Sequence, residues 1–285
     1  MEPNIAILIL AHHKPEQLHI LIEHLQPGFD LYVQIDQKSQ LRIADLPQFD
    51  NVYYYKEVEV YWGDFSQVLN MKHILEQAYA RTYTHYLYIS GDDLPIQSNR
   101  AIKNFFAEHP DQSFMYVNPL PIKTWGFNHG FDRLDRFWYM KIQHRKIAKI
   151  IGRTTHLIQK LLGIKQKRFP LPTYYAGSNW LNLTHAAATE VFNFLDDNPA
   201  YLQSLKYSRA TDEMWIQSIV MNSSLKDKVI HNDLRYIDWE TGPERPRILN
   251  QEDYTLLQKS TALFARKFDL GRDHEFVIEF LQNLK

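Results

Sequence analysis

The sequence has no cysteine, so disulfide bonds and zinc sites built from thiolates are excluded. It also has almost no net charge, with 32 Lys and Arg against 33 Asp and Glu, and no overall positive field favours nucleic acid as a partner. The H-E-x-x-H spacing of metallohydrolases is missing, although residues 12–13 (HH) and His231 with Asp233 leave a weak case for a metal-dependent hydrolase. The first apolar run, residues 5–11, is too short to cross a bilayer and follows no basic segment, which favours a buried strand in a cytoplasmic protein.

Apolar residues make up 45% of the chain and charged residues 23%, a balance typical of a folded protein with a sizeable core. Aromatic residues are frequent at 14%, with 17 Tyr and 6 Trp. Their flat apolar faces and polar edges suit stacking on sugars and bases, although most of them are expected in the core.

Apolar segments alternate with helical patterns through the first 110 residues. We expect strands at 5–10, 31–36, 52–55 and 86–90, and helices from Pro15, over 66–80 and around Phe105. The alternation predicts an α/β fold with a mostly parallel central sheet and helices on both faces. In such sheets ligands bind at the carboxyl ends of the strands, where His12, Asp36 and Asp92 fall.

The second part of the chain is less regular. We expect a strand at 180–183 and helices over 186–195, 212–221, 254–263 and 275–284. Without a repeat or a clear linker, residues 1–285 are interpreted as one domain with an elaborated second half.

The stretch from Lys141 to Arg168 contains nine basic residues and no acidic one, with apolar residues at roughly helical spacing. A basic amphipathic helix can lie on an anionic membrane or face an anionic substrate. A solvated helix that packs on the domain through its apolar stripe explains the pattern equally well.

Two acidic pairs are candidates for chemistry. Asp92 and Asp93 follow a predicted strand, where carboxylates often hold a divalent ion against a diphosphate, but an ordinary turn with a helix cap is the alternative. Adjacent side chains of an extended chain point to opposite sides, so only one of the two would face a site. Asp212 and Glu213 begin a predicted helix, whose dipole would keep Glu213 ionised as a base, although acidic residues are common in first helical turns.

A basic cluster lies near the end of the sequence. Residues 263–269 (LFARKFD) place basic side chains between aromatic ones, and Arg245 and Arg247 precede them. Arginine forks and lysine charges could clamp a diphosphate, but a solvated charged surface explains such a run as well.

Taken together and in order, these motifs resemble glycosyltransferase family 14, which contains the core-2 and I-branching β-1,6-N-acetylglucosaminyltransferases and the peptide O-xylosyltransferases. The resemblance covers most of the chain and rests on seven segments: 7–13 (ILILAHH), 34–39 (QIDQKS), 60–66 (VYWGDFS), 90–96 (SGDDLPI), 175–180 (YAGSNW), 212–213 (DE) and 263–269 (LFARKFD). Animal members carry a membrane anchor and many cysteines, and since this sequence shows neither, it looks like the compact bacterial branch.

The resemblance implies a GT-A type fold, inversion at the anomeric carbon and no metal or other cofactor. It implies that Glu213 is the general base and that Lys267 contacts the donor diphosphate, together with Arg245 or, as we prefer, Arg247. Residues 1–110 would form the nucleotide-binding half and residues 111–285 the acceptor and catalytic half. The remaining residues expected to bind the donor are His12, Asp36, Lys38, Asp92 and Asp93, and those expected to bind the acceptor are Trp180 and Trp239.

By the same resemblance the donor is a UDP-sugar, with UDP-N-acetylglucosamine preferred and UDP-xylose as the alternative. The acceptor is expected to be a glycan hydroxyl in surface polysaccharide assembly. The basic stretch suggests a lipid-linked acceptor at the inner face of the membrane. A glycan-binding protein without catalytic activity is the alternative from another class, and the presence of both Glu213 and Lys267 argues against it.

Overall fold

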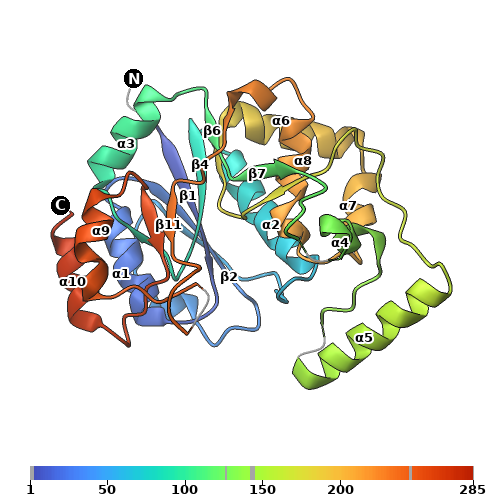
Figure 1. The fold of residues 1–285 in the computed structure, drawn as a ribbon. Coiled ribbons are helices and arrows are strands. Elements are labelled where there is room, and N and C mark those ends of the chain that lie inside the picture. Colours follow the sequence, from blue (N-terminus) through green and yellow to red (C-terminus); the bar gives the residue numbers. More distant parts are fainter. Residues whose placement is uncertain (1–2, 126, 142–144, 244–245, 285) are drawn as a thin grey trace.

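A computed structural model describes residues 3–125, 127–141, 145–243 and 246–284. Its centre is a seven-stranded sheet with the strand order β10-β6-β9-β4-β1-β2-β3 (Figure 1). The strands are β1 (Ile5–Ala11), β2 (Asp30–Ile35), β3 (Val52–Tyr55), β4 (His85–Ser90), β6 (Ser113–Phe114), β9 (Asn182–Thr184) and β10 (Val229–Ile230). All neighbouring pairs are parallel except those of β9, which runs antiparallel to β4 and β6. The predicted mostly parallel sheet is confirmed.

The first strand shows why this sheet is buried on both faces. Ile5, Ile7 and Ile9 pack into one hydrophobic cluster, while Ala6 and Leu8 pack into the other. Side chains alternate across a strand, so an uninterrupted apolar run needs a covered face on each side.

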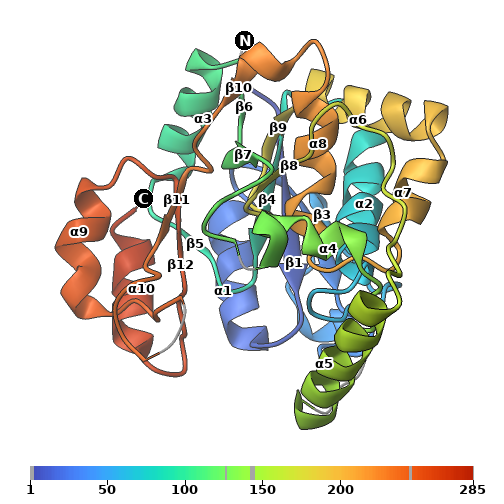
Figure 2. The same cartoon turned by 45° about the vertical axis from the view of Figure 1, so that its right-hand side comes forward.

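Helices supply both covers and give three layers (Figures 1 and 2). The helices packed on the Ile5 face are α1 (Pro15–Leu25), α3 (Asn99–Glu108), α9 (Tyr254–Lys259) and α10 (His274–Gln282). Those packed on the Ala6 face are α2 (Ser66–Tyr79), α6 (His185–Asp197), α7 (Ala200–Leu205) and α8 (Trp215–Met221). Shorter helical turns are η1 (Ile43–Asp45), η2 (Phe127–Gly130), α4 (Asp132–Asp135), η3 (Thr211–Glu213), η4 (Lys226–Lys228) and η5 (Gln251–Asp253).

Two small sheets complete the fold. One has the order β11-β12-β5 and is built from β11 (Arg235–Ile237), β12 (Phe264–Arg266) and β5 (Leu94–Pro95). The other pairs β7 (Val117–Pro119) with β8 (Tyr175–Gly177). Because β5 directly follows the Asp92–Asp93 turn and pairs with β12, it brings the basic cluster of the chain's last part to the end of the central sheet.

Two helix predictions need correction. The helix expected over 212–221 is interrupted at Met214, which has non-helical dihedral angles, so η3 and α8 are separate. The helix expected over 254–263 ends at Lys259, because Ser260 is extended and Leu263 donates a hydrogen bond to the carbonyl of Leu234 as β12 joins its sheet.

The basic stretch forms α5 (Arg145–Leu161), which stands apart from the layers in both views (Figures 1 and 2). Its apolar residues Ile150, Leu157 and Leu161 are exposed, so the helix does not pack through its apolar stripe. Within the described part of the chain, no helix combines the length and apolar character needed to cross a membrane.

Candidate active site

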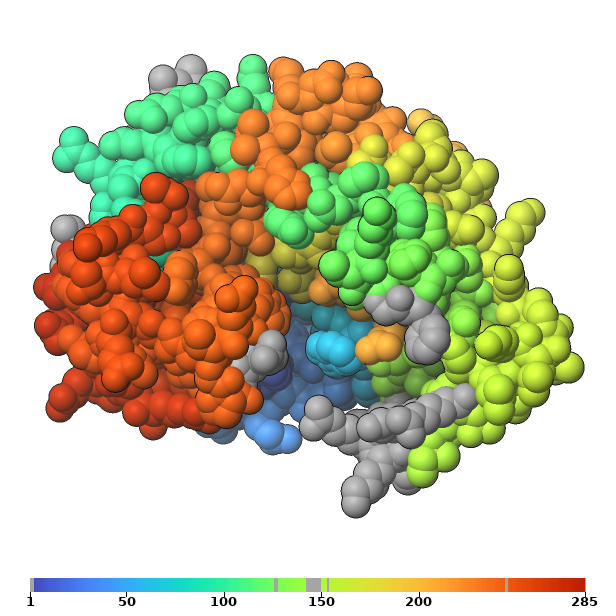
Figure 3. All heavy atoms as spheres, in the orientation of Figure 1, coloured from blue at the N-terminus to red at the C-terminus, as the bar shows by residue number. Residues whose placement is uncertain are grey.

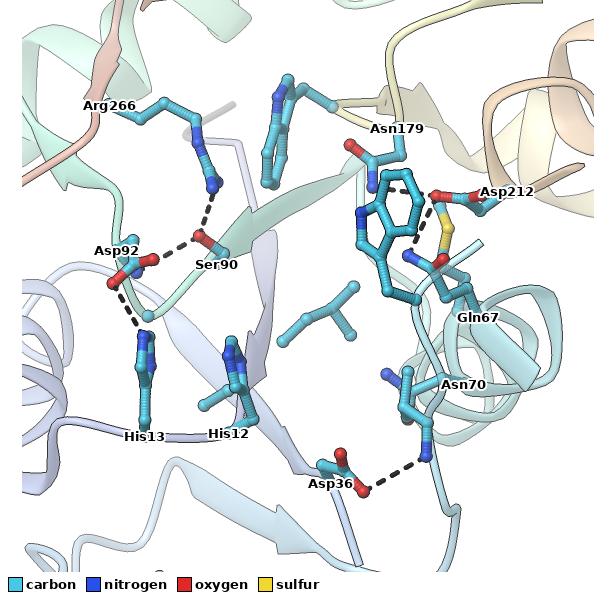
Figure 4. A pocket seen from close by; sticks show the side chains of 17 residues that line it. His12, His13, Asp36, Gln67, Asn70, Ser90, Asp92, Asn179, Asp212 and Arg266 are labelled. Atoms are coloured by element: carbon cyan, nitrogen blue, oxygen red, sulfur yellow. Dashed lines mark hydrogen bonds and ion pairs between the residues drawn. The ribbon is translucent and has the colours of Figure 1, made fainter. Parts of the chain in front are cut away.

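A cavity of about 350 Å³ opens at the carboxyl ends of β1, β2 and β4. The molecule is hollowed there between its orange-red and green parts, with blue and cyan atoms at the floor (Figure 3). Among the predicted site residues, the cavity is lined by His12, Asp36 and Asp92 (Figure 4). Trp180 lines it as well. Its position agrees with the rule for ligand sites in open parallel sheets.

Asp92 gathers basic side chains from two distant parts of the chain. Its Oδ1 lies 2.9 Å from Lys14 Nζ, its Oδ2 lies 3.4 Å from Lys267 Nζ, and His13 Nε2 is 3.7 Å away. Burial opposes ionisation of Asp92, but the hydrogen bond and charge of Lys14 and the charge of Lys267 outweigh it and lower the pKa of the carboxyl group. The result is an ionised carboxylate beside two lysines, one of which, Lys14, also lies 3.2 Å from Asp269 Oδ2.

Asp93 points away from the cavity, as the alternation predicts. It is completely buried, accepts hydrogen bonds from Ser90 N at 2.7 Å and Arg266 Nη1 at 2.9 Å, and burial raises its pKa. Arg266 does line the cavity, where its guanidinium lies 4.5 Å from the ring of Trp180. In this structure Asp93 therefore supports Arg266 and has no surface in the cavity for direct contact with a donor.

His12 and Asp36 come from the ends of β1 and β2. The ring of His12 stacks on that of His13 at 4.0 Å, and burial and the neighbouring His13 lower the pKa of His12. Asp36 Oδ1 accepts hydrogen bonds from Val60 N at 3.1 Å and Lys38 N at 3.0 Å. Lys38 Nζ lies 2.9 Å from Asp36 Oδ2, so this lysine sits behind Asp36 and does not line the cavity.

The preferred arginine partner of Lys267 is engaged elsewhere. Arg247 Nε donates to Asp238 at 2.8 Å, and its two terminal nitrogens donate to Asp253 at 2.9 and 2.6 Å. This fork supports the loop ahead of α9, and Arg247 is not among the cavity-lining residues. Arg245 lies outside the described residues, so the choice between the two arginines stays open. The arginine found in the cavity wall is Arg266, which sequence reasoning missed although it adjoins Lys267.

The opposite wall is built around Asp212. Its Oδ2 accepts hydrogen bonds from Gln67 Nε2 and Asn179 Nδ2, each at 3.2 Å, while its buried Oδ1 has no hydrogen-bond partner among the described residues. Burial, reinforced by the charge of Glu213, raises the pKa of Asp212 to about 7. Gln67, Asn179 and Asp212 all line the cavity. Asn179 and Asp212 belong to the sequence motifs but were not predicted as site residues.

Glu213 lies beside this wall at a partly exposed position. Its Oε2 is 2.6 Å from Arg133 Nη1, and the guanidinium of Arg133 lies 3.8 Å from the ring of Trp125. Glu213 does not lie in the first turn of a helix over 212–221, as predicted, because it belongs to η3 and precedes the start of α8. The charge that faces Glu213 is that of Arg133.

Trp62 was not predicted as a site residue, but it lines the cavity and is 74% exposed. The next residue, Gly63, has φ +72°, a backbone conformation that side chains rarely adopt. Gly63 O accepts a hydrogen bond from Ala210 N at 2.8 Å, which joins this loop to the segment carrying Asp212 and Glu213. Trp239, the other predicted acceptor residue, is half exposed and is not among the lining residues.

One wall of the cavity thus carries Arg266, with Lys14 and Lys267 placed around Asp92, and the opposite wall carries Asp212; these are called the basic wall and the acidic wall. Neither Glu213 nor Lys267 lines the cavity. Each is next to an aspartate that does: Glu213 follows Asp212 in the chain, and Lys267 contacts Asp92. Among the described residues, no three His, Asp or Glu side chains form a group that could hold a metal ion. Positive charge on one side and carboxylates on the other suit a reaction that releases an anion and takes up a proton.

The family model described as Core-2/I-Branching enzyme matches residues 5–258. The match ends ahead of residues 263–269, the motif that carries Lys267. No curated protein matches the chain.

Among solved structures, a glycosyltransferase involved in the glycosylation of the major capsid of PBCV-1 is 13% identical, with 99% of this chain and 98% of that chain covered and a TM-score of 0.36. A putative glucose-1-phosphate thymidylyltransferase from Bacillus anthracis, in complex with a sucrose, is 9% identical, with 66% and 74% covered and a TM-score of 0.31. At these TM-scores neither similarity carries an argument.

Proposed function

The chain belongs to the Core-2/I-Branching enzyme family and is a glycosyltransferase, and we propose that it moves N-acetylglucosamine from UDP-N-acetylglucosamine to a glycan hydroxyl with inversion, giving a β-linkage. The observation that carries the proposal is the opposition of two walls in one cavity: the cations around Asp92 and the carboxylates at 212–213. Inverting transfer needs a base on the side of the sugar opposite the departing diphosphate.

The basic wall takes the role of stabilising the leaving group. As the bond between the sugar and UDP breaks, negative charge grows on the diphosphate, and Lys267 and Lys14 are already held near it by Asp92. Charges that are fixed before the reaction need no reorganisation during it, and the removal of one such contact costs about 10²-fold or more in rate. The same charges can replace a divalent ion, so we propose that transfer is metal-independent.

The acidic wall takes the role of the base. Glu213 accepts the proton of the acceptor hydroxyl as the new bond forms, and Arg133 orients its carboxylate. Asp212 is the competing candidate for this role, because it faces the cavity and its Oδ1 is unpartnered among the described residues. A raised pKa by itself suits a base at neutral pH, so the preference for Glu213 rests on geometry: Glu213 is partly exposed and paired with Arg133, whereas Asp212 is buried and its Oδ2 is held by two amides.

The acceptor side is proposed to use aromatic faces. Trp62 and Trp180 both line the cavity, and Trp rings stack well on sugar faces. We propose a glycan acceptor of surface polysaccharide assembly, carried on a lipid phosphate.

The test is a transfer assay with UDP-N-acetylglucosamine and UDP-xylose, each with and without EDTA, read by mass spectrometry of the glycan product. We expect transfer of N-acetylglucosamine, unchanged by EDTA, and a higher melting temperature with the bound donor. Transfer of xylose alone would select the alternative donor. Loss of activity in EDTA that Mn²⁺ restores would give the diphosphate role to a metal ion. Glycan binding without transfer from any UDP-sugar would indicate a non-catalytic binding protein.

A further inference from the structure

The helix α5 is attached to the body through its polar side. Gln159 is buried, its Nε2 donates to Phe137 O at 3.0 Å, and its Oε1 accepts from Phe137 N at 2.9 Å. One turn earlier, His156 contacts Arg136. These contacts fix which side of the helix faces the protein.

The apolar side of α5 faces away from the protein. Ile150, Leu157 and Leu161 are 65%, 55% and 75% exposed, and their spacing of seven and four residues places them in one stripe. The stripe continues past the helix end into Leu162 and Ile164, which are 69% and 42% exposed. Amphipathic helices of globular proteins normally turn such a stripe toward the core. This helix does the reverse, so its apolar stripe lacks a partner in the described part of the chain.

Charge identifies the kind of surface that would cover the stripe. The stretch from Lys141 to Arg168 carries nine of the 32 basic residues and none of the 33 acidic ones, so the rest of the chain is net negative. A second copy would bring a second stretch of nine like charges against the first. An anionic surface with an apolar interior can pair with the basic residues and also bury the apolar stripe.

We propose that α5 and the residues up to Lys165 dock this protein on an anionic lipid bilayer, with the apolar stripe inserted among the acyl chains and exposed lysines such as Lys160 and Lys165 at the headgroups. Arg168 is excluded from this surface, because its Nε lies 2.7 Å from Asp135 Oδ1 on the protein body. The helix has 17 residues and a strongly basic composition, which suits a position in the plane of the interface.

The segment that holds α5 is connected to the cavity rim by a series of side-chain contacts. Phe137 is followed by Trp138, whose ring lies 5.0 Å from the guanidinium of Arg209, and the same guanidinium lies 5.8 Å from the ring of Trp62 at the cavity rim. Docking through α5 therefore holds that rim near the lipid surface. This last step rests on the proposed transferase function, whereas lipid binding itself does not.

The experiment is flotation of the full chain with vesicles of phosphatidylcholine alone or mixed with phosphatidylglycerol, at low and high salt. We expect binding to the mixed vesicles at low salt and a large loss at high salt, since screening weakens attraction between exposed charges. The variant Leu157→Ser/Leu161→Ser should bind about tenfold less. Leu256→Ser is the matched control, because Leu256 is 49% exposed on α9, and it should bind as the wild type does.

A second pair of variants tests the contribution of charge. Lys160→Glu/Lys165→Glu is compared with the control Lys226→Glu/Lys259→Glu, and all four lysines are exposed in the wild type. Only the first variant should lose binding, and unchanged melting temperatures would show that all variants fold. Failure of the wild type to bind mixed vesicles at low salt would overturn the proposal. So would a dimer in sedimentation that Leu157→Ser/Leu161→Ser dissociates, because a second copy would then cover the stripe. Transfer to a soluble acceptor should not change in any of these variants, which separates docking from catalysis.

Discussion

Asp92 and Asp212 are both buried aspartates that line the same cavity, yet their surroundings push their pKa values in opposite directions. Burial disfavours the charged form of both. Around Asp92 this cost is outweighed by Lys14 and Lys267, whereas Asp212 meets two amides and lies beside another carboxylate. The difference shows that neighbouring charges, more than burial, decide which wall holds an anion and which can exchange a proton.

The proposed function divides the reaction between the two walls. The wall of Asp92 is assembled from β1, β4 and the segment after β12, and the wall of Asp212 from α2, η3 and the loop before β9. Mutations on either side should therefore have different kinetic signatures, which the following experiments use.

The largest expected effect is on the acidic wall. Glu213→Gln should lower kcat by about 10²- to 10⁴-fold, because the amide cannot accept the proton of the acceptor hydroxyl. Calorimetric affinity for UDP-N-acetylglucosamine should hardly change, since the donor diphosphate is proposed to bind at the opposite wall. Asp212→Asn is the matched comparison and should retain more activity. A Glu213→Gln enzyme with full activity, beside an inactive Asp212→Asn enzyme, would transfer the role of base to Asp212.

On the basic wall, Lys267→Ala should lower kcat by about 10²-fold and also weaken donor binding, because a fixed charge near the diphosphate is lost. The control is Lys259→Ala, an exposed lysine on α9. Donor affinity distinguishes the two variants: it should fall in Lys267→Ala but hardly change in Glu213→Gln, and calorimetry with UDP measures it directly. Equal donor affinity in Lys267→Ala and the wild type would show that Lys267 does not contact the diphosphate.

A smaller effect is expected at the rim. Trp62→Ala should raise KM for the acceptor by roughly two- to tenfold and leave kcat and donor binding almost unchanged, as expected for a lost stacking surface. Because Trp62 is mostly exposed, stability should not suffer. Trp239→Ala is the informative counterpart, since Trp239 was predicted to contact the acceptor but is not among the lining residues. If only Trp239→Ala raises KM, the acceptor enters along a different side of the molecule.

The smallest effect concerns stability and compares the two aspartates directly. The folded state raises the pKa of Asp212 from 3.8 to about 7, so it binds more protons than the unfolded state between these values. The contribution of Asp212 to the free energy of unfolding therefore falls as pH rises from about 4 to 7 and is constant above. Relative to the wild type, Asp212→Asn should gain stability over this range, on the order of 1 kcal/mol or more.

Urea unfolding at several pH values between 5 and 8 measures this gain. The control is Asp92→Asn, because the pKa of Asp92 is lowered in the folded state and its stabilisation is lost only at more acidic pH. That variant should be less stable than the wild type throughout this range, with the larger deficit at the acidic end, because the charge of Asp92 counteracts the lowering of the pKa of His12 and His13 by burial. If the free energy of unfolding varies with pH in the same way for the wild type and Asp212→Asn, the raised pKa of Asp212 is contradicted.

Much of the fold could be predicted because local patterns carry it. The apolar run of β1 needs two covered faces, and the structure provides them. The positions of His12, Asp36 and Asp92 follow from the rule that parallel strands end at the same edge. These residues line the cavity as a consequence of topology that the alternation of strands and helices already indicates.

The rest depends on contacts that short segments do not reveal. Lys267 reaches Asp92 because two residues of β5 pair with β12, and strands of this length leave no periodicity to detect. The break at Met214 also has no clear sequence signal. An amphipathic pattern shows that α5 has an apolar stripe, but the side chain that anchors the helix, Gln159, determines that the stripe faces outward.

The pairing of β5 with β12 also has a consequence for how the protein matures. Both aspartates of the 92–93 turn, and the sheet that carries them, are synthesised long before Arg266 and Lys267. During translation Asp92 is thus made before its partner Lys267, and Asp93 before its partner Arg266. The cavity edge at Asp92 and Asp93 is therefore one of the last parts of the molecule to receive all of its ion-pair partners.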